Sequence, residues 1–105
     1  MPAPMTPIDE NFRPLAARSA TYNIAAAAAV KAGPGRLIRI SVVTVGSTAG
    51  TINDCAATGD AAIGNQIGSI PTTWVAGTVV EFDWPCSTGI TIVPGTSGVL
   101  AVSFS

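Results

Sequence analysis

Few side chains of this chain could act as general acids, general bases or nucleophiles, and none of them is a histidine. Beyond position 18, the candidates are four carboxylates and two thiols: Asp54, Asp60, Glu81, Asp83, Cys55 and Cys86. The lack of histidine removes the commonest base near neutral pH, the usual Ser and Cys triads and most zinc sites. We therefore predict that this chain is not an enzyme and has no catalytic, cofactor-binding or metal-binding residues.

Glu81 and Asp83 are the only pair whose spacing resembles acid/base chemistry. Two positions apart on one strand, their carboxylates would be about 7 Å apart, close to the separation that glycosidases use. Catalytic pairs usually come from different elements that meet in a cleft, whereas these two share one strand face. We favour a solvated or interfacial face, with the carboxylates paired to Arg36 or Arg39 across a sheet.

The remaining polar candidates are explained more simply by turns and burial. Asp54 and Asp60 follow Asn53 and Gly59, a pattern of turn residues that lacks the spacing of a calcium loop. The two cysteines lie 31 positions apart, without a Cys-x-x-Cys motif, and could form only one bridge. We expect both to be free, buried thiols.

Residues 1–18 are predicted to form an extended N-terminal arm. Pro2, Pro4, Pro7 and Pro14 fix the backbone φ and remove donors, which favours extended conformations. A disordered tail is the alternative, because termini are usually disordered unless something holds them. The arm also carries three spaced apolar residues that could dock on this subunit or a neighbour, and we name them as candidate interface residues: Ile8, Phe12 and Leu15.

Residues 19–105 are predicted to form one domain of about seven short strands. The strands are expected at 19–32, 36–45, 51–57, 61–70, 77–84, 89–93 and 99–104, with Gly, Pro, Thr and Ser between them. The alanines at 25–29 leave a helix open for the first segment, but its period of two favours a strand. Turns every 8–12 residues are typical of an antiparallel β-sandwich or jelly roll, so the predicted class is all-β.

The two tryptophans receive different predictions. Trp84 alternates with Phe82 and Val80, so we expect Phe82 and Trp84 in the core and Pro85 to end their strand. Trp74 lies in a connection after Pro71, where it would either cover one end of the sandwich or form an interface. Trp74 is therefore our fourth candidate interface residue.

Charge is scarce, and it is scarcest in the strand-rich part. Charged residues make up 10% of the chain, against roughly 25% in an average domain. Protein interfaces are depleted of charge, so we expect much of the surface to be covered by other subunits. The net charge of −1 and the lack of a basic run argue against nucleic acid, and no apolar run is long enough to span a membrane.

Several turn-and-strand segments resemble those of small structural proteins of tailed bacteriophages. They are Gly-Pro-Gly-Arg-Leu (33–37) opening into a long strand, Ala-Gly-Thr-Ile-Asn-Asp (49–54), Gln-Ile-Gly-Ser-Ile-Pro (66–71), Pro-Cys-Ser-Thr-Gly-Ile (85–90) and the stretch at 93–104. The resemblance covers residues 20–105 and carries over no site residues. It implies a multimerising virion β-sandwich such as a capsid decoration, or cement, protein.

Composition and resemblance lead to one functional expectation and one alternative. We expect a virion structural protein, assembled in the host cytoplasm, that binds between major capsid subunits and stabilises the shell. It would form a symmetric homo-oligomer, with a trimer favoured, and would contact the major capsid protein or other virion subunits. The alternative is a neck, tail or receptor-binding module that recognises a host-surface glycan, with Trp74 and the Thr/Ser-rich loops as its motivation.

Overall fold

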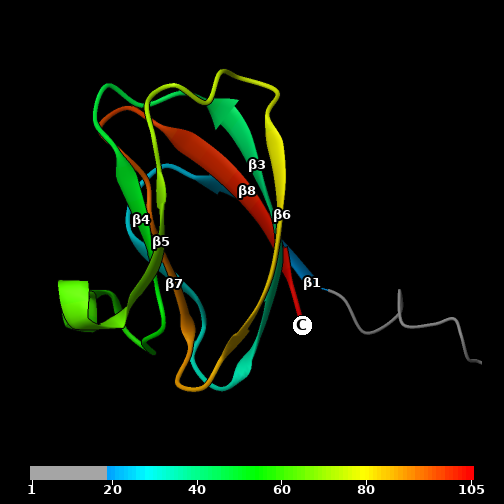
Figure 1. Cartoon of the computed structure of the whole chain (residues 1–105), viewed down its shortest axis with the longest axis vertical. Helices are drawn as coiled ribbons and strands as arrows, with labels where there is room; N and C mark the ends of the chain where they lie inside the picture. The colour runs from blue at the N-terminus through cyan, green and yellow to red at the C-terminus, as the bar shows by residue number, and fades with distance from the viewer. Residues whose placement is uncertain (1–18) are drawn as a thin grey trace, which may run out of the picture.

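The computed structural model describes residues 19–105, which form two four-stranded antiparallel sheets packed face to face (Figure 1). Their strands are β1 (Ser19–Ile24), β2 (Ala28–Lys31), β3 (Gly35–Thr44), β4 (Gly50–Asn53), β5 (Gln66–Ile70), β6 (Val79–Cys86), β7 (Ile90–Val93) and β8 (Val99–Phe104). One sheet has the order β1-β8-β3-β6 and the other β2-β7-β4-β5. The predicted arm, with Ile8, Phe12 and Leu15, lies outside the described residues.

The strand pairing is that of a jelly roll. The pairs are nested along the chain, with β1 on β8, β2 on β7, β3 on β6 and β4 on β5. Further pairs, β3 with β8 and β4 with β7, join these ladders into the two sheets. Only β4 and β5 are consecutive strands that also pair, so every other connection crosses from one sheet to the other. The predicted sandwich class is confirmed, with eight strands rather than about seven.

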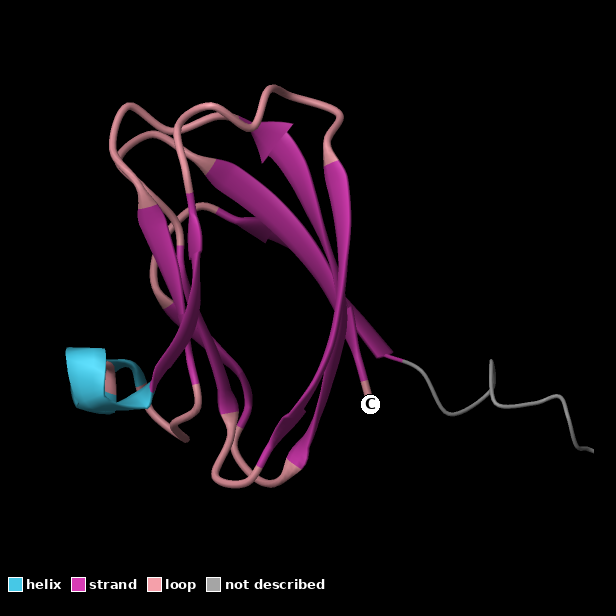
Figure 2. Ribbon diagram, in the orientation of Figure 1, coloured by secondary structure: helices cyan, strands magenta, loops and turns pink. Residues whose placement is uncertain are grey.

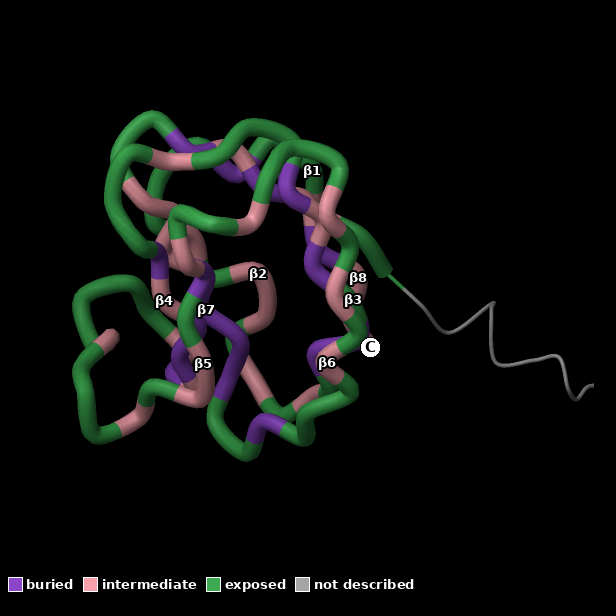
Figure 3. Tube along the Cα trace, turned by 45° about the horizontal axis from the view of Figure 1, so that its top comes forward, coloured by how far each residue is buried: buried purple, intermediate pink, exposed green. Residues whose placement is uncertain are grey.

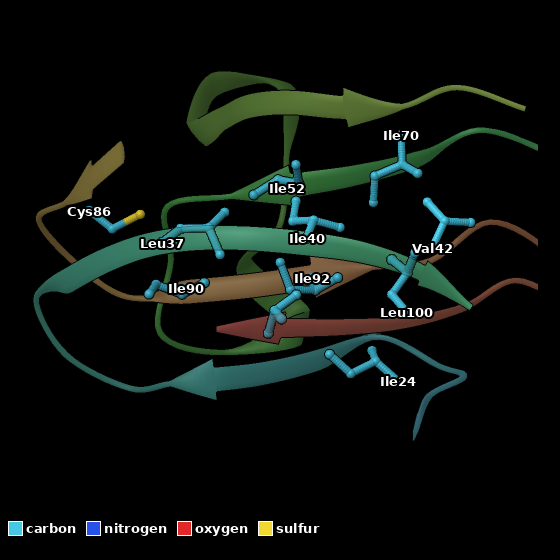
Figure 4. Packing of buried hydrophobic residues seen from close by; sticks show 11 residues of the cluster. Ile24, Leu37, Ile40, Val42, Ile52, Ile70, Cys86, Ile90, Ile92 and Leu100 are labelled. Carbon is cyan, nitrogen blue, oxygen red and sulfur yellow. The ribbon is translucent and has the colours of Figure 1, made fainter. Parts of the chain in front are cut away.

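The core lies between the two sheets and consists mainly of aliphatic side chains (Figure 4). Leu37, Ile40 and Val42 of β3 face Ile52 of β4 and Ile92 of β7, and all five are fully or almost fully buried. These β-branched and aliphatic residues fit a pleated surface buried on one side. The hydrophobic effect of this layer therefore holds the two sheets together.

Residues 19–32, expected as one strand, form two strands that belong to different sheets. β1 ends at Ile24 and β2 begins at Ala28, so the chain crosses the sandwich at Ala25–Ala27. Asn23 has a φ of +54°, and the β1–β8 register shifts between Thr21 and Ile24. This kink turns Ile24 into the core while Tyr22 stays exposed, although regular alternation would place both on one face. The helix alternative is wrong for this segment.

Strand β6 departs from its prediction in two ways. It continues through Pro85 to Cys86, which an edge strand allows because it pairs on one side only. Trp84, expected in the core, keeps 45% of its surface exposed. One reason is that β6 is an edge strand. The other is that its pairing with β3 is irregular, since Asp83 has a φ of +50° and the register shifts between Leu37 and Arg39 of β3.

Phe82, and not Trp84, packs between the two sheets at the edge that β5 and β6 form. It is partly buried and packs against the core. A Cβ atom on Gly68 of β5 would lie 2.5 Å from the end of its ring. The missing side chain at Gly68 therefore leaves the room in which Phe82 bridges the edge strands β5 and β6.

The segment between β4 and β5 is the only helical part of residues 19–105 (Figure 2). β4 ends at Asn53 rather than Ala57, and two 3-10 turns follow, at Thr58–Asp60 and Ile63–Asn65. The segment expected at 61–70 as a strand or irregular edge becomes the second of these turns and the edge strand β5. Within the described residues, no helix is long and apolar enough to cross a membrane.

Candidate functional site

The carboxylates of Glu81 and Asp83 are each paired with an arginine on the neighbouring strand. Arg39 Nη2 lies 3.1 Å from Glu81 Oε2, and Arg36 Nη1 lies 3.1 Å from Asp83 Oδ1. Arg36 Nη1 also donates to the backbone oxygen of Asp83. This confirms the predicted cross-strand pairing. Such exposed pairs each stabilise a fold by about 0–1 kcal/mol, and here they leave the sheet face locally neutral.

Asp54 organises the turn between β6 and β7. Its carboxylate accepts hydrogen bonds from the backbone amides of Ser87, Thr88 and Gly89, at 3.0, 2.8 and 3.1 Å, and from the Ser87 hydroxyl. Burial alone would raise the pKa of Asp54, but these donors favour the charged form and the net pKa is lowered. Asp54 therefore stabilises a turn, as predicted, but it is the turn at residues 87–89 between β6 and β7.

The two thiols are free and buried. Cys55 Sγ donates to the backbone oxygen of Ala57 at 3.3 Å. Burial, with a smaller contribution from the Asp54 charge, raises the pKa of Cys86 to about 11. Because the thiolate is the nucleophile, the Cys86 thiol is poorly reactive at neutral pH.

The fourth carboxylate, Asp60, is exposed on the first 3-10 turn. Across residues 19–105, no three His, Cys, Asp or Glu side chains gather in a way that could hold a metal ion. The chemically reactive residue types thus serve turns, ion pairs and the core. Within residues 19–105, one apolar surface, on the outer face of the β1-β8-β3-β6 sheet, stays exposed.

The outer face of the β2-β7-β4-β5 sheet is covered in part by the segment between β4 and β5. Asn53 and Thr91 lie opposite each other on this face, and both are buried. Asn53 Nδ2 donates to the backbone oxygen of Ala62 at 3.0 Å and to Asn65 Oδ1 at 2.9 Å. The Thr91 hydroxyl donates to the backbone oxygen of Cys55 at 2.9 Å. These bonds tie residues 55–65 to their own sheet.

The outer face of the β1-β8-β3-β6 sheet has a different character. One row across the strands runs Ala20, Ser103, Arg39 and Glu81, and the next includes Ala101, Ser41 and Val79. Small side chains on β8 and β3 form the floor of a groove of about 210 Å³, which Tyr22 and Val79 flank. We call this surface the outer groove. Among its lining residues, only Arg39 is charged.

Large apolar side chains are exposed on this same face. Tyr22 keeps 75% of its surface exposed, and Val43 and Val79 are more than half exposed. In Figure 3, the exposed residues of this sheet lie on β1, β3 and β6, whereas β8 is buried or intermediate along its whole length. Regular alternation would place Tyr22 on the same face as Ile24, so the sequence pattern did not indicate an exposed position for Tyr22. Asn23 was the available signal, since asparagine tolerates the left-handed backbone that such a kink requires.

Trp74 lies at one end of the sandwich. It is partly buried and packs against the core, where it lines a small cavity of about 10 Å³ with Ile70 and Leu100. This confirms that Trp74 covers an end of the core. Its role as an interface residue stays a prediction.

No protein-family model matches the chain, and neither a curated protein nor a solved structure matches it. The resemblance to bacteriophage structural proteins therefore stays a prediction. The jelly-roll topology follows from the strand pairing alone.

Proposed function

We propose that this chain is a non-enzymatic structural protein of a bacteriophage virion, which decorates the capsid by binding between major capsid subunits. The observation that carries the proposal is the neutral outer face of the β1-β8-β3-β6 sheet, with Tyr22, Val43 and Val79 exposed on it. An apolar face of this kind in a charge-poor chain favours contact with other subunits.

The way charge is distributed supports an assembly role. Seven charged residues lie in positions 19–105, and four of them, Arg36, Arg39, Glu81 and Asp83, neutralise one another in two pairs. A protein that works as a free monomer normally relies on surface charge for solubility. A subunit whose faces are covered after assembly has less need of it.

The fold is compatible with this function and with its alternative. Jelly rolls occur in viral capsid proteins and in lectin domains, among others. A fold by itself does not assign a function, so this support is by analogy. The interior is filled by hydrophobic side chains, which suits a protein that must persist in a particle.

The glycan-binding alternative draws on one observation, the half-exposed indole of Trp84 at the sheet edge. Exposed tryptophan rings combine apolar surface with a polar N–H, a combination useful in recognition. If this function holds, Trp84→Ala would abolish adsorption to host cells and a glycan array would give signals well above background. If binding to particles persists in Trp84→Ala while the array stays blank, decoration is favoured.

Counting copies in purified particles tests the proposal most directly. A capsid decoration protein should be present in hundreds of copies, whereas a neck or tail protein follows lower symmetry with about a dozen or fewer. Quantitative labelling of the protein in intact virions distinguishes the two. Absence from purified virions would reject a structural role altogether.

Deleting residues 1–18 tests the role predicted for the arm. We expect the truncated protein to keep its fold, because the described sandwich is complete from Ser19 onward. Its occupancy on capsids should fall at a fixed protein concentration, because the contacts of Ile8, Phe12 and Leu15 would be lost. Unchanged occupancy would reject the arm as a binding element while leaving the copy-number test unaffected.

A further inference from the structure

We propose that the outer face of the β1-β8-β3-β6 sheet binds the same face of a second copy about a twofold axis, with Tyr22 of each copy inserted into the outer groove of the other. The inference goes beyond the proposed function, because it concerns contact between two copies of this chain. It names the surface that the copies share and the side chain that anchors it.

The contrast between the two outer faces selects this surface. On the β2-β7-β4-β5 sheet, residues 55–65 fold back over Asn53 and Thr91, and Thr91 is completely buried although it lies on the outer face. On the β1-β8-β3-β6 sheet, the described residues provide no such cover, and Tyr22 stays 75% exposed. Among residues 19–105, the chain thus covers part of one outer face and leaves the outer groove of the other open.

The shape of the face suits a second sheet. Ser41, Ala101 and Ser103 form a low floor on the two central strands, so another backbone can approach closely. The groove volume of about 210 Å³ is several times the roughly 30 Å³ that one water molecule occupies in the liquid. This is room for an aromatic ring. Tyrosine is also among the residues that most often anchor interfaces.

The charges on this face are compatible with a copy of the same chain as its partner. Arg39 and Glu81 lie side by side on this face, 3.1 Å apart. A twofold axis turns the face onto itself in the opposite sense, so the arginine of one copy can lie near the glutamate of the other. A partner with a single sign of charge would find no complementary patch here. The face is therefore neutral, and two copies can meet on it without opposing like charges.

The size of the face predicts a weak contact. Four strands about 4.8 Å apart and about six residues long cover roughly 400 Å² per copy, about half of the 800 Å² per partner in a standard interface. Pairing should thus depend on protein concentration and increase where copies are held together on a particle. A twofold pair also implies an oligomer with an even number of copies, in contrast to the trimer expected from the sequence.

Sedimentation of the full chain over a wide concentration range tests the pairing. We expect a reversible monomer–dimer equilibrium, with association weakened about tenfold or more in Tyr22→Ser. The matched control is Ile63→Ser, which removes an even more exposed apolar side chain (91%) on the second 3-10 turn and should leave association unchanged. Both residues are exposed, so circular dichroism should show that both variants keep the fold.

A cross-linking measurement identifies the face. Ser41→Cys places a thiol on the groove floor, and Ser69→Cys places one on the exposed side of β5, while Cys55 and Cys86 stay buried. A short bismaleimide should link two copies through position 41 and not through position 69. Monomers at every concentration, equal cross-linking at both positions, or a trimer unaffected by Tyr22→Ser would each overturn the proposal. Virion copy number is measured separately, so the proposed function can hold or fail independently.

Discussion

The carboxylate of Asp54 accepts a hydrogen bond from the backbone amide of Thr88 at 2.8 Å, across 34 positions of sequence. The neighbouring amides of Ser87 and Gly89 donate to the same side chain. One charged group at the end of β4 thereby sets the turn that delivers β7 into the centre of its sheet. The lowered pKa of Asp54 is the electrostatic signature of these bonds.

Asp54→Asn should destabilise the protein by about 1–2 kcal/mol at pH 7, since the amide group cannot accept all of these bonds and loses the charge that strengthens them. The folded-state pKa lies below the ordinary 3.8, so the stabilisation is complete above about pH 5 and disappears as the pH falls through the folded pKa. Urea denaturation of both proteins across pH 2–7 measures this. The curves should converge at acid pH, and Asp60→Asn should track the wild type throughout.

Gly95→Ala should destabilise the protein strongly, by about 3 kcal/mol. A Cβ atom at Gly95 would clash with the backbone oxygen of Thr48, and backbone cannot move aside as a flexible side chain can. The clash would separate the loop before β4 from the turn before β8. Gly64→Ala is the control, because a Cβ there meets nothing within 4 Å. Equal melting temperatures for the two variants would contradict the packing described here.

Asn53→Ala should loosen residues 55–65 more than the rest of the fold. The substitution removes both donated bonds, to Ala62 and Asn65, and the one accepted from Thr51. Leaving such buried groups unsatisfied costs about 1–3 kcal/mol. Limited proteolysis should cut this segment faster than in the wild type, while Gln66→Ala, at an exposed position, should not change the rate. Faster cleavage elsewhere in the chain would show global unfolding instead.

Cys86 should resist alkylation in the folded protein. With a pKa raised to about 11, only about one thiol in a thousand is ionised at pH 8. Iodoacetamide followed by peptide mass spectrometry should show slow modification of Cys86 at pH 8 and rapid modification in denaturant. Stoichiometric labelling under native conditions would mean that this end of the sandwich opens readily.

Sequence patterns predicted the strands best where the residue types or their spacing favoured β-structure alone. The strand at 36–45 is rich in β-branched and aliphatic residues, the strand at 99–104 alternates regularly, and both were placed to within one residue. The pairing of Arg36 and Arg39 with Asp83 and Glu81 also followed, because charges on facing strands have few other partners. Asp54 was predicted from its local sequence as a turn residue, but the turn that it holds lies 33 to 35 positions away, which no local pattern indicates.

The amino-acid sequence by itself determined the all-β class, the approximate strand positions and the shortage of charge, because each depends on local residue type and period. The tertiary structure decided which strands pair, where Tyr22 and Trp84 lie, and which outer face residues 19–105 leave open. Those outcomes depend on the kinks at Asn23 and Asp83 and on bonds between residues far apart in sequence. A single extra residue in a ladder reverses which face a side chain occupies, and that reversal is why Ile24 enters the core while Tyr22 faces the outer groove.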